Sequence, residues 1–199
     1  MPDEVARTPV RRPRMTPDRE AELLGVALKA LREIGYGALS MDLIASRGHC
    51  SKATLYRQWG NKPKMIAAAV SALQPVDPGV TDTGTLRGDL LSVLGQLTLG
   101  ADDDTTLFAA LHHALLTDPV LAETFRTSLL EPERLNLQRI VQRAVARGEL
   151  PHEPAAAEFL PHLVLSAVVA RPLFQGAAAD SGYVERYVDE VLLPTLRAV

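Results

Sequence analysis

The segment that most constrains the fold runs over residues 40–64, with the sequence SMDLIASRGHCSKATLYRQWGNKPK. Ser40 is a good N-cap, so the segment predicts a short helix over Met41 to Arg47. Gly48 ends that helix, and Ser51 is a second N-cap that starts another. The segment therefore predicts two short helices joined by a tight turn.

The second of these helices divides into a core face and an outer face. Leu55 and Trp59 lie four residues apart and therefore on one side, and Ala53 is small enough to let a neighbouring helix approach closely. Such an outer face suits the major groove of DNA, where Arg, Lys and Gln can bond base edges and the Thr methyl can touch thymine. The side chains left to point outward are Lys52, Thr54, Arg57 and Gln58.

Two further features suit the phosphate backbone rather than the bases. Tyr56 carries a hydroxyl on a rigid ring. The turn after Gly60 opens a new helix, whose free amides attract anions and to which Lys62 adds a charge. The DNA-contacting residues expected from the segment are Ser40, Ser51, Lys52, Thr54, Tyr56, Arg57, Gln58 and Lys62.

Residues 16 to 70 resemble the N-terminal DNA-binding domain of TetR-family transcriptional regulators. The motifs that carry the resemblance are Tyr36-Gly37, Leu39-Ser40-Met41, Ile44-Ala45, Ser51-Lys52-Ala53-Thr54-Leu55-Tyr56-Arg57, Trp59 and Asn61-Lys62. A second stretch, DTGTLRGDL over residues 82–90, resembles the opening of the C-terminal domain in one branch of that family. The resemblance implies an all-α protein in which a three-helix helix-turn-helix domain precedes a larger helical domain for ligand binding and dimerisation.

The turn between the two short helices departs from the family pattern. The family usually has Ala-Gly-Val before the serine, whereas this chain has Gly48-His49-Cys50, so the glycine is displaced by one position. Histidine tolerates a left-handed backbone better than most residues, and we therefore expect the turn to be kept. Oxidation of Cys50 could disturb the turn, but a free cysteine is more often a small buried apolar residue.

The net charge of −3 is unevenly distributed along the 199 residues. Residues 1–64 carry 12 Lys and Arg against 7 Asp and Glu, whereas the remainder carries 9 against 17. A basic N-terminal part beside an acidic remainder suits phosphate binding at one end, although an ordinary solvated pair of basic helices would show the same charge. With no apolar run of about 20 residues and no apolar signal peptide, we expect a cytoplasmic protein without a membrane segment.

The chain divides into three parts. Residues 1–15, rich in Pro and Arg, are expected to form a disordered basic arm, which could reach a minor groove or only attract phosphates. Residues 16–64 form the predicted helix-turn-helix domain, whose first helix starts after Thr16 and ends at Gly35. Residues 65–199 form the predicted regulatory and dimerisation domain.

The regulatory part is expected to be helical throughout, with a loop over residues 74–85 and an acidic loop at 102–104. Pro194 is expected to kink or fray the last helix. The apolar periodicity and the caps predict helices over 64–73, 86–99, 105–116, 118–129, 132–147, 154–173 and 181–199.

The last two predicted helices form the candidate dimer interface. The helix over 154–173 is apolar on most of its circumference, which requires burial on more than one side. A two-fold dimer would also place two DNA-reading heads about 34–36 Å apart, the spacing of a palindromic operator. A core helix in a monomer remains the alternative.

A mainly apolar pocket between the middle helices is the candidate site for a small-molecule effector. Core packing is the alternative role for each of its residues. The pocket is expected to be lined by Leu94, Leu97, Phe108, His112, Leu137, Gln138, Val141 and His162.

No catalytic, phosphate-loop or metal-binding motif is present in the sequence, so we predict neither an enzyme nor a cofactor. The resemblance implies a homodimeric, sequence-specific regulator, expected to be a repressor released from a palindromic operator by a small ligand. The alternative is a helical dimer that binds a small molecule or a protein without reading a DNA sequence.

Overall fold

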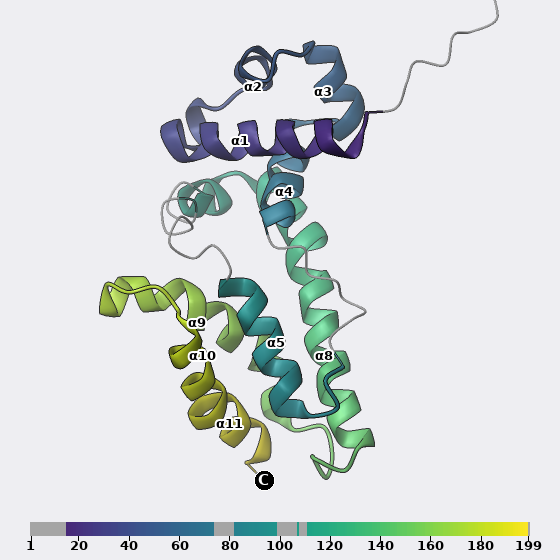
Figure 1. Ribbon diagram of the computed structural model, residues 1–199, viewed down its shortest axis with the longest axis vertical. Helices are drawn as coiled ribbons and strands as arrows, with labels where there is room; N and C mark the ends of the chain where they lie inside the picture. The colour runs from purple at the N-terminus through teal and green to yellow at the C-terminus, as the bar shows by residue number, and fades with distance from the viewer. Residues whose placement is uncertain (1–14, 74–81, 99–106, 108–110, 199) are drawn as a thin grey trace, which may run out of the picture.

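The computed structural model describes residues 15–73, 82–98, 107 and 111–198, and every regular element within these ranges is helical. Figure 1 shows a small body made by α1, α2 and α3 at one end of the molecule, with α4 beneath it and the C-terminal helices extending away from it. Within the described ranges, none of the helices is long and apolar enough to cross a bilayer.

The N-terminal helices are α1 (Pro17–Ala38), α2 (Met41–Arg47), α3 (Lys52–Trp59) and α4 (Lys62–Leu73). Local capping fixes their starts: the side chains of Thr16, Ser40 and Ser51 each accept a hydrogen bond from the backbone N–H three residues later. Gly35, at φ 74°, interrupts α1 as expected, but one further turn follows it before the helix ends. The predicted bounds of α2 are confirmed.

One apolar core joins these helices to the start of the C-terminal half. It contains Leu23 and Leu31 of α1, Leu55 of α3 and Met65 of α4, each 0% exposed. Leu121, on a later helix, belongs to the same core. The predicted domain boundary at residues 64–65 remains a prediction, and the apolar core runs across it.

The middle of the chain contains α5 (Leu86–Thr98), a helical stretch over residues 111–117, α7 (Pro119–Phe125) and α8 (Glu131–Ala146). We expected a break between the last two, but a π-helical turn, Arg126–Leu130, joins them into one continuous rod.

The π turn accommodates Pro132, whose ring would clash with the carbonyl four residues earlier in a regular α-helix. Glu131 N instead donates to the carbonyl of Arg126, five residues back. The expectation of two separate helices was therefore wrong.

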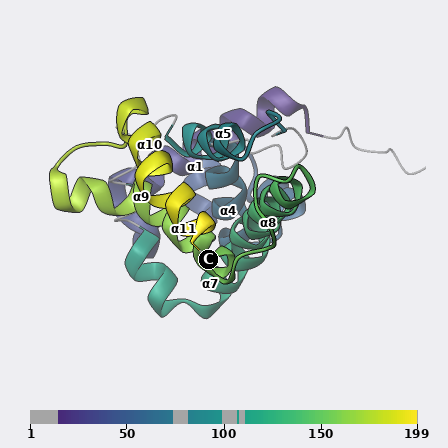
Figure 2. The same ribbon diagram turned by 90° about the horizontal axis from the view of Figure 1, so that it is seen from below.

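The C-terminal part begins with a 3-10 turn, Ala155–Phe159, which leads into α9 (Leu160–Gln175). The last helical run comprises α10 (Ser181–Tyr187), a second π turn (Val188–Leu192) and α11 (Leu193–Arg197). Pro194 does not fray this run, which continues to Arg197. As at Pro132, the preceding π turn accommodates the proline ring, and Leu193 N donates to the carbonyl of Val188. Figure 2 shows α8 on one side of this run and α9 on the other.

A second apolar core holds α5, α8, α9 and the last run together. Asp89 of α5 fixes this core at the end of α8. It is a fully buried carboxylate that accepts from Thr83 N at 2.7 Å and pairs with Arg147 at 3.2 Å. Burial raises the pKa of Asp89, but the bonds from Thr83 and the two arginines Arg143 and Arg147 outweigh it and lower the pKa overall. The DTGTLRGDL stretch therefore has a structural role, because it ties the start of α5 to the end of α8.

Several predictions fall on residues that lie outside the described ranges. These are the basic arm apart from Met15, the loop over 74–81, the acidic loop at 102–104, Phe108, and the first part of the predicted helix over 105–116.

Candidate nucleic-acid interface

The outer face of α3 presents a continuous polar surface. Leu55 and Trp59 are buried beneath it, 0% and 7% exposed. Lys52, Tyr56 and the adjacent pair Arg57 and Gln58 are exposed, and Thr54 is half-buried. The division into two faces is as expected, except that Ala53 is exposed and so lies on the outer face rather than against a neighbouring helix.

Ser40 and Ser51 act first as helix caps. Ser40 Oγ accepts from Leu43 N at 3.2 Å, and Ser51 Oγ accepts from Thr54 N at 3.1 Å. Ser51 Oγ also lies 2.8 Å from the Thr54 hydroxyl oxygen, so one of these two hydroxyls donates to the other at the start of α3. The two serine side chains therefore fix where α2 and α3 begin.

Two residues of α3 are held by carboxylates of neighbouring helices. Lys52 Nζ lies 2.7 Å from Asp42 Oδ1 of α2. Gln58 Nε2 donates to Glu20 Oε1 of α1 at 3.2 Å. Because a carboxylate only accepts hydrogen bonds, Glu20 fixes which end of the Gln58 amide is the nitrogen, and the amide oxygen is left for a base.

In the turn between α2 and α3, Gly48 allows close packing on α1 and His49 adopts the left-handed backbone. His49 has φ 47° and is the one non-glycine residue with positive φ in the described part of the chain. A Cβ on Gly48 would lie 2.5 Å from Leu23 Cδ2 and 3.0 Å from the carbonyl oxygen of Ile44. The glycine therefore permits close packing on α1, and the histidine adopts the left-handed conformation, so the expectation that the turn is kept is confirmed.

Arg19 of α1 braces this turn. Its guanidinium donates to the carbonyl oxygens of Gly48 and His49, and it pairs with Glu22 at 2.6 Å. Cys50 follows the turn and is half-buried; burial raises the pKa of its thiol, and the nearby Arg19 offsets this only partly. A raised pKa keeps the thiol protonated, which does not favour reaction with oxidants.

Lys62 is turned toward the protein rather than toward an outside phosphate. Its ammonium donates to the carbonyl oxygens of Tyr36 and Leu39, both at 3.0 Å, and lies 3.9 Å from the centre of the Tyr36 ring. Partial burial lowers its pKa. The side chain therefore caps the C-terminal end of α1, a role that the sequence did not indicate.

The residues expected to line an effector pocket do not form one group. Leu94, Leu137 and Val141 are buried in the second core, and Leu97 packs against it. His112 and His162 are exposed on different helices, Phe108 lies outside the described residues, and Gln138 is half-buried on α8.

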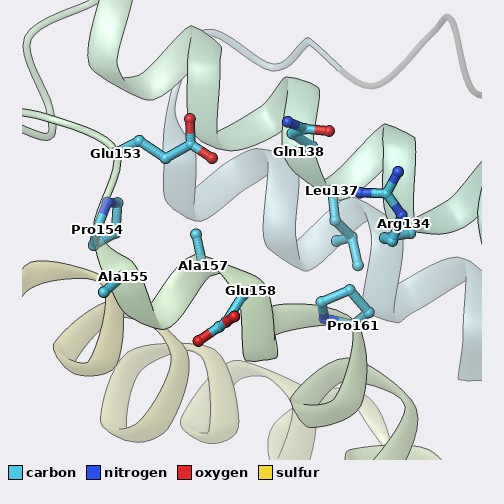
Figure 3. A pocket seen from close by; sticks show the side chains of 9 residues that line it. All are labelled: Arg134, Leu137, Gln138, Glu153, Pro154, Ala155, Ala157, Glu158 and Pro161. Carbon is cyan, nitrogen blue, oxygen red and sulfur yellow. The ribbon is translucent and has the colours of Figure 1, made fainter.

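Leu137 and Gln138 do line a cavity of about 620 Å³, which lies between α8 and the segment that enters α9 (Figure 3). The cavity is not between the middle helices, where we expected it. Its other lining residues are Arg134, Glu153, Pro154, Ala155, Ala157, Glu158 and Pro161.

The outer face of α3 is supported by three residues whose roles the sequence did not indicate, namely Arg19, Glu20 and Asp42. Each belongs to a different helix from its partner or lies many residues from it, so helical periodicity carries no signal for these contacts. The sequence shows only that Asp42 lies in the first turn of α2, where a negative charge interacts favourably with the helix dipole.

Comparison with known proteins agrees with this geometry. Residues 23–69 match the family described as bacterial regulatory proteins, tetR family, and residues 80–191 match the Tetracyclin repressor-like C-terminal domain. The chain belongs to the TetR family. As in that family, the TetR-type N-terminal domain contains the helix-turn-helix of α2 and α3, and the protein is a DNA-binding transcriptional regulator.

Relatives with this TetR organisation span nearly the whole chain. A DNA-binding transcriptional repressor TetR of Mycobacteroides abscessus is 37% identical over 181 residues, 90% of this chain and 94% of the relative. An uncharacterized HTH-type transcriptional regulator of Mycobacterium bovis is 30% identical over 179 residues, 89% of this chain and 88% of the relative.

Solved TetR structures share the fold. The flavonoid-responsive regulator FrrA superposes with a TM-score of 0.62 at 22% identity, covering 91% of this chain and 96% of that one. A TetR transcription regulator from Haloarcula marismortui gives a TM-score of 0.60 at 20% identity, covering 89% of this chain and 96% of that one.

Proposed function

We propose that this protein represses transcription as a homodimer that binds a palindromic operator through α3 and leaves it when a small molecule binds the C-terminal half. The exposed polar face of α3, supported by a buried Leu55 and Trp59, carries the proposal. A rigid helix with an apolar base and a polar outer face is what major-groove reading requires. The relative from Mycobacteroides abscessus, named a repressor, supports the direction of regulation.

The outer residues divide by chemistry into base readers and phosphate binders. Arg57 suits guanine, whose O6 and N7 accept from a guanidinium, and Thr54 can touch a thymine methyl. Gln58, with its oxygen left free by Glu20, can accept from the amino group of adenine or cytosine. Lys52 and Tyr56, whose side chains lie together, with Nζ 5.8 Å from the ring centre, suit the phosphate backbone beside them.

The dimer is proposed to form through α9 and the run from α10 to α11. Apolar side chains of the 3-10 turn and α9 are exposed to an extent unusual for a monomer: Phe159 is 55%, Leu165 43% and Phe174 87% exposed. Burying this surface against a second copy would remove it from water and place two copies of α3 on one face of DNA. Sedimentation showing a monomer at micromolar concentration would contradict this.

Selection of bound duplexes from a random pool at physiological salt tests the proposal. We expect an enriched palindrome, and an operator affinity far above the affinity for random DNA. Arg57→Ala should relax the preference at one base pair of each half-site and cost about 1 to 3 kcal/mol. The control is Arg139→Ala, which removes an exposed arginine of α8. It should change neither the base preference nor the operator affinity.

Equal loss on operator and random DNA for Arg57→Ala would show that this residue is not a base reader. No enrichment from a folded dimer would favour the alternative of a helical binding module without sequence-specific recognition, since a merely basic surface binds all sequences alike.

A further inference from the structure

We infer that the cavity between α8 and the entry to α9 is a binding site for a small organic cation with an apolar body. The inference rests on the proposed function, because it names the chemical class of the effector. It stands on three observations: the size of the cavity, its apolar floor, and an excess of carboxylates that have no cation to neutralise them.

The cavity is a groove with two walls of different origin. One face of α8 supplies Arg134, Leu137 and Gln138, as Figure 3 shows. The opposite wall comes from residues 153–158 and from Pro161 in the first turn of α9. Its volume of about 620 Å³ lies within the range of roughly 300–1,000 Å³ that is usual for small-molecule sites.

The floor of the groove suits an apolar body. Leu137 is 1% exposed and belongs to the second core, so it offers little surface of its own but forms a rigid apolar base under the groove. Pro154, Ala155, Ala157 and Pro161 add small or rigid apolar groups with little rotamer freedom. A ligand pressed against them would lose water-exposed area without ordering flexible side chains.

The charged groups at the rim favour a positive ligand. Arg134 is already paired, because its Nε and Nη2 donate to the two carboxylate oxygens of Glu131 at 2.9 and 2.7 Å. Glu153 and Glu158 are exposed, and neither forms an ion pair with any residue that the structure describes. An anion would meet two unpaired carboxylates and one paired arginine, whereas an ammonium could pair with either carboxylate.

Gln138 adds a neutral polar group on the α8 side, and its amide can donate or accept. A molecule with a cationic head at Glu153 or Glu158 and one further polar atom near Gln138 would therefore suit the polar groups around the groove. A fatty acid or another carboxylate would not.

The groove is also placed to influence the DNA-binding end. The helix α8 continues through the π turn into α7, whose N-cap Asp118 bonds to Tyr36 of α1. A ligand that separates α8 from the entry to α9 would tilt this continuous rod and so shift the support of α1. The ligand affects DNA binding only if it prefers the tilted arrangement.

Binding of a matched pair of probes tests the site directly. The probes are 3-phenylpropylammonium and 3-phenylpropionate, which share an apolar body and differ in the sign of the head group. Calorimetric titration of the full chain at low salt should show binding of the ammonium and none of the carboxylate. The double variant Glu153→Gln/Glu158→Gln should weaken ammonium binding by about fivefold or more, since two exposed charge contacts are lost.

Glu190→Gln is the control, because it removes an exposed carboxylate of the second π turn that does not line the groove. It should bind the ammonium as the wild type does. Glu131→Gln should weaken ammonium binding as well, because it releases the charge of Arg134 into the groove. These variants remove surface charges, and unchanged melting temperatures would confirm that they fold.

Equal binding of the two probes, equal binding by wild type and double variant, or no binding of the ammonium would each overturn the inference. Operator binding is measured on the same samples with and without the ammonium probe. A protein that binds the ammonium but no operator would contradict the proposed repressor and leave the site standing, whereas operator binding that never responds to a bound ammonium would refute its role as an effector.

Discussion

The Tyr36 hydroxyl donates a hydrogen bond of 3.3 Å to Asp118 Oδ2, which joins the end of α1 to the start of α7. The other oxygen of Asp118 accepts from the backbone N–H groups of Val120 and Leu121, both at 3.0 Å. One carboxylate thus caps a helix of the C-terminal half and holds a tyrosine of the DNA-binding end. Burial and the nearby Asp118 raise the pKa of Tyr36, so its hydroxyl stays a donor.

Replacing Tyr36 by Phe should lower both stability and operator affinity. The change removes one hydrogen bond to a charged group, worth about 1.5 to 3 kcal/mol, and leaves the ring in place. Tyr187→Phe is the control, since its hydroxyl bonds to the carbonyl of Leu163 at 3.1 Å, away from α1. Thermal unfolding and operator titration should show both variants destabilised and only Tyr36→Phe weakened on DNA.

Substitution of Gly48 should destabilise the protein much more than substitution of His49. Gly48→Ala places a methyl group against Leu23 and the Ile44 carbonyl, and should cost about 1 to 3 kcal/mol. His49→Gly relieves a left-handed backbone while adding freedom to the unfolded chain, so the net change should stay under about 1 kcal/mol. Chemical denaturation of both variants checks this, and a tolerated Gly48→Ala would contradict the role given to the glycine.

Removing the charge of Asp42 should make DNA binding tighter and less selective. Asp42→Asn frees the Lys52 ammonium and takes a negative charge away from the DNA-facing surface. Affinity for random DNA should rise, with a salt dependence steeper by about one counterion. Asp189→Asn, which breaks a similar pair of 2.7 Å with Arg87 far from α3, should leave DNA binding unchanged. An unaltered gap between operator and random DNA would refute this role for Asp42.

The substitution Lys62→Met should act mainly on stability. The ammonium satisfies two carbonyl oxygens at the end of α1, and Met keeps the apolar stem while removing those bonds. We expect a loss of about 1 to 3 kcal/mol with little change in the salt dependence of DNA binding. An unchanged melting temperature with a salt slope lower by about one would instead place this charge on a phosphate, as the sequence alone indicated.

The pH dependence of stability should include a contribution from Glu133 of α8. Burial raises its pKa above the usual value of a glutamate, and the amide of Asn136 offsets this only partly. The folded state then binds the proton more tightly than the unfolded state, so this carboxyl favours folding at low pH and opposes it once ionised.

Glu133→Gln should therefore raise the melting temperature relative to wild type near pH 7. The advantage should shrink as the pH falls through the raised pKa and should vanish well below about 4.5, where the wild-type group is protonated in both states. Thermal unfolding of both proteins across this range measures the difference. A constant difference at all pH values would show that the carboxyl does not titrate in this way.

Local signals in the sequence were sufficient to place the short helices of the DNA-binding end. Caps such as Ser40 and Ser51 depend on residues three positions away, which is why the start of each short helix could be placed. The buried pair of Leu55 and Trp59 followed from helical spacing in the same way. The separation of α3 into an apolar base and a polar outer face needed no tertiary information.

What could not be predicted depends on contacts between distant segments. Glu20 and Gln58 are 38 residues apart, and Lys62 and Tyr36 are 26 apart. No periodicity links such pairs. The cavity is a similar case, because its two walls come from α8 and from the chain entering α9, and the sequence pointed to apolar residues between other helices that instead pack as core.

The π turn within the rod from α7 to α8 also sets which way each half of the rod faces. One extra residue in a helical turn rotates everything after it by about 100° relative to an uninterrupted α-helix. Leu121 and Phe125 before the turn lie in the core of the DNA-binding end, and Ile140 and Ala144 after it lie in the core of the C-terminal half. One continuous helical run therefore packs in both apolar cores. A rotation of α8 about its axis would rotate α7 within the core of the DNA-binding end.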